Sequence, residues 1–165
     1  MSAPAAAPIS RIIDLVEAQR LVNTWRLKSD RIVFTNGVFD ILHKGHVTYL
    51  EEAAALGHRL VIGLNSDASV KRLGKGDDRP LNDQDSRATV LAALRCVDAI
   101  VLFDEDTPME LIQVIGPDVL VKGGDWAPER IVGAEYVKSY GGDVRSIPLV
   151  DGFSTTNLVE KIRRG

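Results

Sequence analysis

Five short apolar runs recur along the chain, and they are separated by segments in which apolar residues repeat every three or four positions. The runs are rich in β-branched and aliphatic residues and cover residues 31–35, 59–64, 99–103, 118–122 and 143–147. Most of them are continuously apolar rather than alternating, which is typical of strands buried on both faces of a sheet. The pattern therefore predicts five buried strands with helices between them.

Two of the helical segments carry recognisable ends. Asp14 and Glu17 stand at capping-box spacing at the start of a first helix over residues 14–28. In the stretch TPMELIQVIG, Thr107 is placed as an N-cap and Gly116 lies just beyond the last helical residue. Alternating strands and helices with short links predict an α/β fold, in which helices cover both faces of a parallel sheet.

The length of 165 residues fits a single domain, expected over residues 10–165, behind a disordered N-terminal tail over residues 1–9. No apolar run is long enough to span a membrane, and the opening stretch lacks the features of a secretory signal. The single cysteine, Cys96, excludes an internal disulfide framework and fits a reducing cytoplasm. With a net charge of −3, a large nucleic-acid-binding surface is not indicated.

The stretch TNGVFDILHKGH follows the first predicted strand and leads into a helix. Gly37 permits a tight turn, and Gly45 permits close approach of a ligand at the helix start, where free N–H groups attract anions. His43 and His46 are three residues apart and can lie on one side of the first turn, with Lys44 between them. This arrangement favours phosphate oxygens. A capped turn with incidental histidines is the alternative, whereas a zinc site lacks further ligands at suitable spacing.

Two later strand ends carry similar chemistry. In VKGGDW, Lys122 closes a strand before two glycines and Asp125, although a solvated strand end would look the same. In GFSTTNLVEKI, the hydroxyl residues Ser154, Thr155 and Thr156 open a helix. Plain N-capping explains one of these hydroxyls better than it explains three. Ligands of parallel α/β sheets bind at such strand ends, so we expect these segments to meet.

Several common catalytic signatures are absent from the sequence. It contains no P-loop, no classical dinucleotide fingerprint and no nucleophile elbow. The residues fit a displacement at phosphorus, in which the substrates supply both the nucleophile and the leaving group. Such transfers are catalysed mainly by positioning and by stabilisation of charge.

The segment GVFDILHKGH, residues 37–46, resembles the G-x-F-D-x-x-H-x-G-H signature of the cytidylyltransferase-like nucleotidyltransferases, and the STT stretch resembles their second motif. Within that superfamily, segments over about residues 14–162 look like the bacterial D-glycero-β-D-manno-heptose 1-phosphate adenylyltransferases, which often form the C-terminal half of a bifunctional enzyme with a sugar kinase. Because no kinase precedes the motif, we expect a stand-alone enzyme supplied by a separate sugar kinase.

The resemblance implies a Rossmann-like three-layer sandwich with a five-stranded parallel sheet. It also implies transfer of AMP from ATP to heptose 1-phosphate, giving ADP-heptose and pyrophosphate for the lipopolysaccharide inner core. Mg²⁺ is expected to bind through the ATP phosphates, without a protein metal site. The residues that the resemblance assigns to catalysis are His43, His46 and Lys44. Those assigned to the nucleotide are Asn36, Gly37, Phe39, Asp40, Gly45, Arg95, Ser154, Thr155 and Thr156. Those expected on the sugar-phosphate side are Arg79, Lys122 and Asp125.

Two departures separate the chain from the glycerol-phosphate and choline-phosphate branches of the superfamily. Leu149 and Val150 stand where those branches carry Arg and Thr. Their R-Y-V-D-E-V stretch reads RCVDAI here, so Arg95 is kept but Cys96 replaces the aromatic residue. Arg87 lies eight residues before Arg95, and the two would project on similar sides of one helix, where they could also be surface charges.

Two rival functions remain at this stage. One is a cytidylyltransferase that makes a CDP-alcohol such as CDP-glycerol, because no residue distinguishes adenine from cytosine. The other is a non-catalytic nucleotide-binding module, although both motif histidines and the STT helix start are intact. A homo-oligomer is expected from the resemblance, and the helix over residues 14–28 could either form an interface or pack within the subunit.

Overall fold

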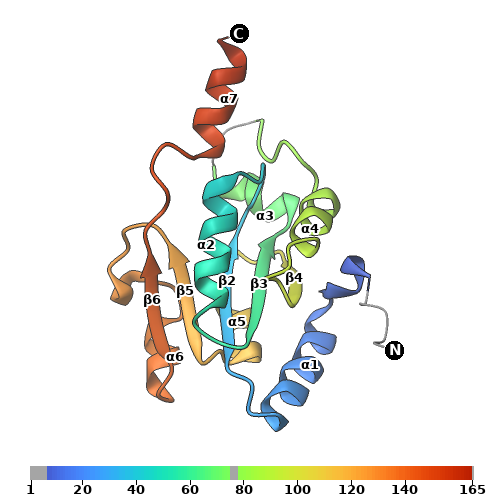
Figure 1. The fold of residues 1–165 in the computed structure, drawn as a ribbon, viewed down its shortest axis with the longest axis vertical. Helices are drawn as coiled ribbons and strands as arrows, with labels where there is room; N and C mark the ends of the chain where they lie inside the picture. Colours follow the sequence, from blue (N-terminus) through green and yellow to red (C-terminus); the bar gives the residue numbers. More distant parts are fainter. Residues whose placement is uncertain (1–6, 75–77, 165) are drawn as a thin grey trace.

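The computed structural model describes residues 7–74 and 78–164. Its centre is one parallel sheet with the strand order β1-β4-β3-β2-β5-β6 (Figure 1). The strands are β1 (Ile12–Ile13), β2 (Ile32–Gly37), β3 (Arg59–Asn65), β4 (Ala99–Phe103), β5 (Val119–Gly123) and β6 (Asp143–Ile147). The α-helices are α1 (Leu15–Leu27), α2 (Lys44–Ala54), α3 (Asp67–Arg72), α4 (Gln84–Ala92), α5 (Met109–Ile115), α6 (Ala134–Ser139) and α7 (Thr155–Arg163), with the 3₁₀ helices η1 (Pro8–Arg11) and η2 (Pro128–Arg130).

The predicted α/β class and parallel sheet are confirmed, but the predicted number of five strands is wrong. The sixth strand is β1, in which Ile12 pairs with Ile100 and Ile13 with Val101 of β4. A strand of two residues that directly precedes a helix N-cap gives no apolar run in the sequence. This strand forms because it pairs with the edge of β4. The local sequence around Ile12 and Ile13 contains no information about that partner.

The helix ends agree in part with their predicted caps. The capping box of α1 is confirmed, since Asp14 accepts from the Glu17 N–H at 2.8 Å and Glu17 accepts from the Asp14 N–H at 3.3 Å. The prediction of Thr107 as an N-cap is wrong. Helix α5 begins one residue later, with Pro108 in the cap position and no side-chain cap, because the Pro108 carbonyl already accepts from the Ile112 N–H at 2.9 Å. Gly116 follows the last residue of α5, as predicted, and it adopts the left-handed conformation.

The predicted tail over residues 1–9 lies mainly on residues 1–6, outside the described residues, and Pro8 begins η1. Within the described part of the chain, no helix has the length and apolar character that a membrane crossing requires.

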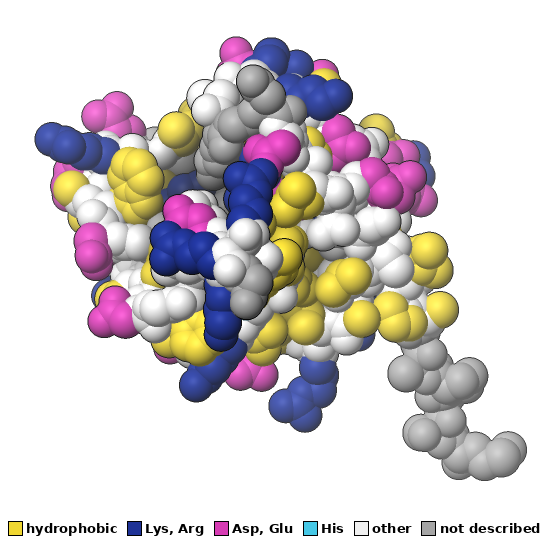
Figure 2. Space-filling model, turned by 90° about the horizontal axis from the view of Figure 1, so that it is seen from above, with side chains coloured by type: hydrophobic (Ala, Val, Ile, Leu, Met, Phe, Trp, Pro, Cys, Tyr) yellow, Lys and Arg dark blue, Asp and Glu magenta, His cyan; other side chains and the backbone are white. Residues whose placement is uncertain are grey.

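All neighbouring strands run parallel, so their carboxyl ends lie at one end of the molecule, where α7 stands (Figure 1). Seen from above in Figure 2, this end carries Lys and Arg side chains near its centre. From β2, the strand order runs through β3 and β4 on one side and through β5 and β6 on the other. The direction of the strand order therefore reverses between β2 and β5. Ligands of open α/β sheets bind at such a point.

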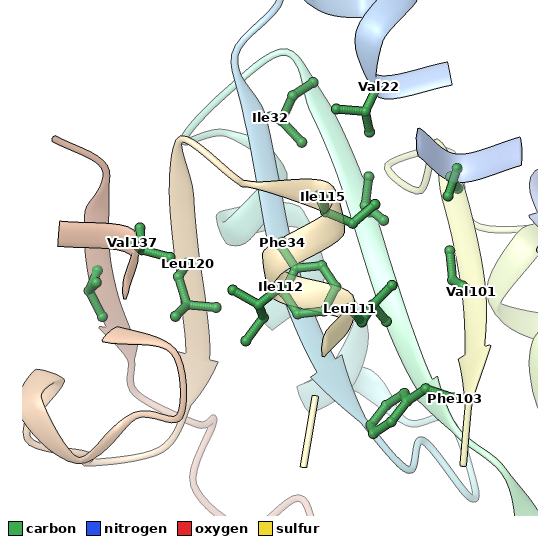
Figure 3. Close-up of a cluster of buried hydrophobic side chains, with 14 of the residues drawn as sticks. Val22, Ile32, Phe34, Val101, Phe103, Leu111, Ile112, Ile115, Leu120 and Val137 are labelled. Carbon is green, nitrogen blue, oxygen red and sulfur yellow. The ribbon is translucent and has the colours of Figure 1, made fainter. Parts of the chain in front are cut away.

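Alternate residues of the strands feed two separate cores, one on each face of the sheet. Ile32 and Phe34 of β2 join the core beneath α1, α5 and α6, which Figure 3 shows. Val33 joins the opposite core beneath α2 and α4. Because both faces are covered, the central strands β2, β3 and β4 are mostly buried and largely apolar, as the sequence pattern indicates, whereas Arg145 of the edge strand β6 is exposed. The two cores give three layers and fix the strand ends on which the site is built.

Candidate active site

A cavity of about 300 Å³ opens at the carboxyl ends of β2 and β5, between these strands and the start of α7. It lies at the reversal of strand order, where the sheet topology leads us to look. Many of the predicted site residues line it together, although they come from four separate parts of the chain. These are Asn36, Gly37, Phe39, Asp40, His46, Arg79, Lys122, Thr155 and Thr156.

The turn from β2 into α2 depends on an unusual backbone conformation. Phe39 has a φ of 48°, which is in the left-handed region and rarely adopted by a bulky residue. This conformation folds its ring back over Gly37, where an added Cβ would lie 2.9 Å from Phe39 Cε2. The same ring meets His46 edge-on, with centroids 5.4 Å apart. Gly37 is therefore required so that Phe39 can support the His46 imidazole.

The two motif histidines are brought together, as their spacing predicts. His43 is the N-cap residue of α2, and its ring stacks on that of His46 with centroids 3.8 Å apart and an interplanar angle of 20°. The Nδ1 atoms of both rings are buried and have no hydrogen-bond partner among the described residues. Buried polar atoms without a partner are rare in proteins and are costly unless a ligand or water completes them.

The electrostatics of this pair keep both imidazoles neutral at pH 7. The pKa of His46 is lowered to about 4, chiefly by burial and also by the neighbouring His43, while a hydrogen bond with the backbone of Ile41 opposes the change. Burial also lowers the pKa of His43. Neutral imidazoles still donate an N–H, so the pair can hydrogen-bond phosphate oxygens while the α2 N-terminus supplies a favourable field.

Asp40 organises the segment over residues 79–82, from which Arg79 reaches the cavity. Its carboxylate accepts from Arg79 Nη1 at 2.9 Å and from the N–H groups of Leu81 and Asn82, each also at 2.9 Å. Burial alone would raise the pKa of Asp40, but the hydrogen bonds from Asn82, Leu81 and Arg79 outweigh it and lower the pKa. Asp40, which the resemblance assigns to the nucleotide, thus also holds the backbone of Leu81 and Asn82 in place. Its partner Arg79 borders the cavity beside Asp40.

Arg87 is a buried positioning residue of the site, although the sequence analysis did not assign it to the site and left open that it is a surface charge. Its side chain is fully buried, and it donates to the carbonyls of Val38, Asn65 and Asn82 at 2.6, 2.9 and 3.1 Å. It also pairs with Asp67 at 2.7 Å. One guanidinium thus ties α4 to the ends of β2 and β3 and to the Asp40 segment. Its position near the start of a helix, after a strand-end loop, was the one available signal. The sequence alone does not distinguish a buried arginine at this position from an exposed one.

Helix α7 brings the second predicted motif to the cavity. Ser154 is its N-cap and accepts from the Asn157 N–H at 3.0 Å, so plain N-capping accounts for this hydroxyl. Thr155 and Thr156 line the cavity at the first turn, whose N–H groups lack partners within the helix. At the far end of α7, Arg163 pairs with Asp78 at 2.8 Å. This ion pair ties the helix to the residue that directly precedes Arg79.

Tyr49 and Leu149 are among the residues that line the cavity without belonging to the predicted set. Tyr49 lines it from α2, and its hydroxyl lies 2.5 Å from Thr35 Oγ1 in the core. Burial raises the pKa of Tyr49 to about 12, so the ring stays neutral. Leu149, one of the two departures in the sequence, lines the cavity beside Gly123, where an added Cβ would meet Leu149 Cδ2 at 3.0 Å.

The remaining predicted residues lie outside the cavity lining. Gly45 is covered by Phe153 and His43, and Lys44 Nζ lies 5.8 Å from the centroid of the Phe153 ring. Asp125 is exposed in the loop after β5. Arg95 is exposed in the turn between α4 and β4, where the strands begin, so it lies at the opposite end of the sheet from the cavity. The expected shared helical face of Arg87 and Arg95 is therefore wrong, because α4 ends at Ala92.

Comparison with known proteins places this geometry in a family. The model of the family described as cytidylyltransferase-like matches residues 34–158, which include both helix starts of the cavity. The chain therefore belongs to the cytidylyltransferase-like family, and it is a nucleotidyltransferase.

Curated relatives agree with this assignment. The chain is 56% identical over 156 residues to the bifunctional protein HldE of Geotalea uraniireducens, covering 94% of this chain and 32% of that protein. It is 59% identical over 137 residues to the bifunctional protein HldE of Syntrophotalea carbinolica, covering 83% of this chain and 28% of that protein. The chain thus spans about a third of the length of these relatives.

Solved structures give the same fold. The lipopolysaccharide core biosynthesis protein of Thermoplasma volcanium is 31% identical with a TM-score of 0.59, over 73% of this chain and 97% of that one. A pantoate-β-alanine ligase of Francisella tularensis is 14% identical with a TM-score of 0.60, over 93% of this chain and 79% of that one, which is a likeness of fold alone.

Proposed function

We propose that the chain transfers AMP from ATP to D-glycero-β-D-manno-heptose 1-phosphate, releasing pyrophosphate and forming ADP-heptose for the lipopolysaccharide inner core. The observation that carries the proposal is the meeting of two helix N-termini on one cavity, that of α2 with His46 and that of α7 with Thr155 and Thr156. Two such termini suit the α-phosphate and the β,γ-phosphates of one triphosphate.

The reaction is a direct displacement. A phosphate oxygen of the sugar 1-phosphate forms a bond to the α-phosphorus of ATP, and the bond from that phosphorus to the bridging oxygen of the β-phosphate breaks. Pyrophosphate leaves with the electron pair. His46 donates its N–H to the α-phosphate oxygens as charge builds on them, and His43 holds the His46 ring in place by stacking. The Thr155 and Thr156 end of α7 stabilises the leaving pyrophosphate.

Mg²⁺ is proposed to arrive with the nucleotide rather than through protein ligands. No cluster of three His, Cys, Asp or Glu side chains that could hold a metal occurs in residues 7–74 and 78–164. The acid at the cavity, Asp40, is already engaged by Arg79 and two backbone N–H groups. Residues of this kind fit an ion bound by phosphates and water, which lowers the negative charge of the triphosphate.

The sugar substrate and the choice of ATP are supported by similarity. The chain resembles the heptose 1-phosphate adenylyltransferases along most of its length, and the relative of known structure at 31% identity is a lipopolysaccharide core biosynthesis protein. Leu149 lines the cavity where CDP-alcohol enzymes carry an arginine, which counts against that alternative. We further propose that a sugar kinase supplies the substrate, that the enzyme works in the cytoplasm, and that it forms a homo-oligomer.

Pyrophosphate release tests the proposal. Wild-type protein is assayed with Mg²⁺ and four mixtures: ATP with heptose 1-phosphate, ATP alone, CTP with heptose 1-phosphate, and CTP with glycerol 3-phosphate. We expect rapid release only in the first mixture, with ADP-heptose identified by mass spectrometry. Faster release with CTP and glycerol 3-phosphate would replace this function with CDP-alcohol synthesis. Binding of ATP without release in any mixture would indicate a non-catalytic module.

A further inference from the structure

A second, smaller cavity of about 130 Å³ adjoins the first. The two share Asn36 and Lys122, which form the wall between them, with Lys122 Nζ 3.4 Å from Asn36 Oδ1. None of the residues assigned to the nucleotide other than Asn36 lines this second cavity. Its remaining walls come from Pro108 before α5 and from the loop after β5, namely Trp126, Arg130, Ile131 and Val132.

Trp126, one of the residues that line this cavity, is held in a fixed orientation by hydrogen bonds. Its indole Nε1 donates to the Gly123 carbonyl at 3.1 Å, and its backbone N–H donates to Ser146 Oγ at 3.2 Å. Gly124, at a φ of 112°, lets the chain turn here, since an added Cβ would lie 3.1 Å from Trp126 Nε1. The polar edge of the indole is thus satisfied while the side chain stays 48% exposed. A half-exposed aromatic ring fixed in this way offers an apolar face to the C–H side of a sugar ring.

The charges around the cavity suit a phosphate. No described residue accepts a hydrogen bond from the Arg130 guanidinium, which lies exposed at the end of η2. Lys122 stands at the wall toward the first cavity. A guanidinium can bind phosphate through two parallel hydrogen bonds, and an ammonium adds a second positive charge. The loop after β5 also carries two carboxylates, and neither lines the cavity. Asp125 is exposed, and Glu129 pairs with Lys138.

We propose that the cavity between Trp126 and Arg130 is the subsite for the sugar 1-phosphate. The sugar ring lies against Trp126, and Arg130 and Lys122 bind its phosphate at the wall that adjoins the first cavity. This orientation presents a phosphate oxygen to the α-phosphorus held by His46. The sugar side of the site is thereby assigned to Trp126 and Arg130, since the expected Arg79 is engaged with Asp40 in the first cavity. This inference rests on the proposed function.

Steady-state kinetics of four variants test the subsite. Arg130→Gln and Trp126→Ala are expected to raise KM for heptose 1-phosphate about tenfold or more, while KM for ATP stays within about twofold. Arg130→Lys and Trp126→Phe are expected to restore part of the loss, because they keep a cation and a ring. Arg20→Gln, an exposed arginine on α1, is the matched control and leaves both constants unchanged. An unchanged KM for the sugar phosphate in Arg130→Gln and Trp126→Ala overturns the inference.

A binding measurement separates this inference from the proposed function. The chain has two tryptophans, of which Trp25 is 7% exposed in the core, so fluorescence changes at the site report on Trp126. Titration with heptose 1-phosphate, and separately with glucose 1-phosphate, is expected to give a saturable change in the wild type that Trp126→Phe lacks. Turnover without this change overturns the subsite but leaves the function. A response to glucose 1-phosphate without turnover of heptose 1-phosphate keeps the subsite and rejects the proposed sugar. No response and no turnover reject both.

Discussion

His46 sits at the meeting point of a strained turn, a stacked histidine and a helix N-terminus. The ring of the left-handed Phe39 meets its imidazole edge-on, and the ring of His43 stacks on it. Each neighbour restricts the imidazole, so the donor atom is already oriented before a substrate arrives. Such preorganisation is the main way in which a protein stabilises charge that develops in a transition state.

His46→Ala should lower turnover on the order of a hundredfold or more while ATP binding stays largely intact, because a donor to the transition state is lost. Pyrophosphate release gives the turnover, and nucleotide titration gives the binding. His58→Ala is the matched control, since His58 is exposed before β3 at the opposite end of the sheet. Turnover near that of the wild type would remove His46 from the mechanism.

The same histidine should make stability depend on pH. The pKa of His46 is lowered from 6.5 to about 4 in the folded protein, chiefly by burial. Between these values the unfolded chain binds a proton that the folded chain does not, so the free energy of unfolding falls as the pH drops from 6.5 toward 4. His43 acts in the same direction. In urea denaturation at pH 7 and pH 5, His46→Gln should lose less stability than the wild type. Equal losses in the two proteins would contradict the assignment.

Single residues differ in how far their sequence context reveals them. His43, His46 and Thr155 were predictable because phosphate chemistry restricts residue type and spacing within a short motif. Arg87 was not, because its partners at Val38, Asn65 and Asp67 are distant in sequence and meet only in the folded chain. Arg79 was expected on the sugar-phosphate side, but it pairs with Asp40. This contact was not predictable either, because Asp40 is also distant from Arg79 in sequence.

At the scale of elements, the site depends on how helices and loops are fixed at the strand ends. Helix α7 has no buried residue, so its start is held by the Ser154 cap and its end by the Arg163–Asp78 pair. Helix α4 is held by the buried Arg87, which joins three loops. The two helices therefore respond differently to mutation.

Ser154→Ala should weaken the start of α7 by about 1 kcal/mol, since the Asn157 N–H loses its acceptor. Because Thr155 and Thr156 follow directly, we expect KM for ATP to rise more than kcat falls. Steady-state kinetics measure both constants. Thr24→Ala, which removes an exposed hydroxyl from α1, is the control. If KM for ATP is the same in both variants, α7 does not hold the nucleotide through its first turn.

Arg87→Ala should lower the free energy of unfolding by about 3 kcal/mol or more, because it leaves Asp67 and three carbonyls without their buried partner. Chemical denaturation measures the loss, with the exposed Arg20→Ala as control. Arg87→Lys should recover little of it, since an ammonium cannot match four acceptors held by a planar guanidinium. A loss no greater than that of Arg20→Ala would show that the network contributes nothing to the fold.

On the scale of the whole molecule, the alternation of apolar runs and helical periods predicts a parallel α/β sheet with its ligand site at the strand ends. Strand order, which locates the site between β2 and β5, required the structure. The edge strand β1 escaped prediction because its two residues gain their partner from β4. Helix α1 buries Ala18, Val22 and Trp25 within the subunit, while its Val16 and Leu27 stay exposed. A homo-oligomer stays a prediction.

A single-turnover reaction tests the central claim, that this one site joins ATP and a sugar phosphate by direct displacement. Enzyme in excess is mixed with ATP labelled at the α-phosphate, with and without heptose 1-phosphate, and the label is followed in time. We predict that the label passes into ADP-heptose only when the sugar is present, in step with pyrophosphate release, and that none becomes attached to the protein. Label that stays in ATP, or that appears on the protein before any sugar is added, would contradict the proposed reaction.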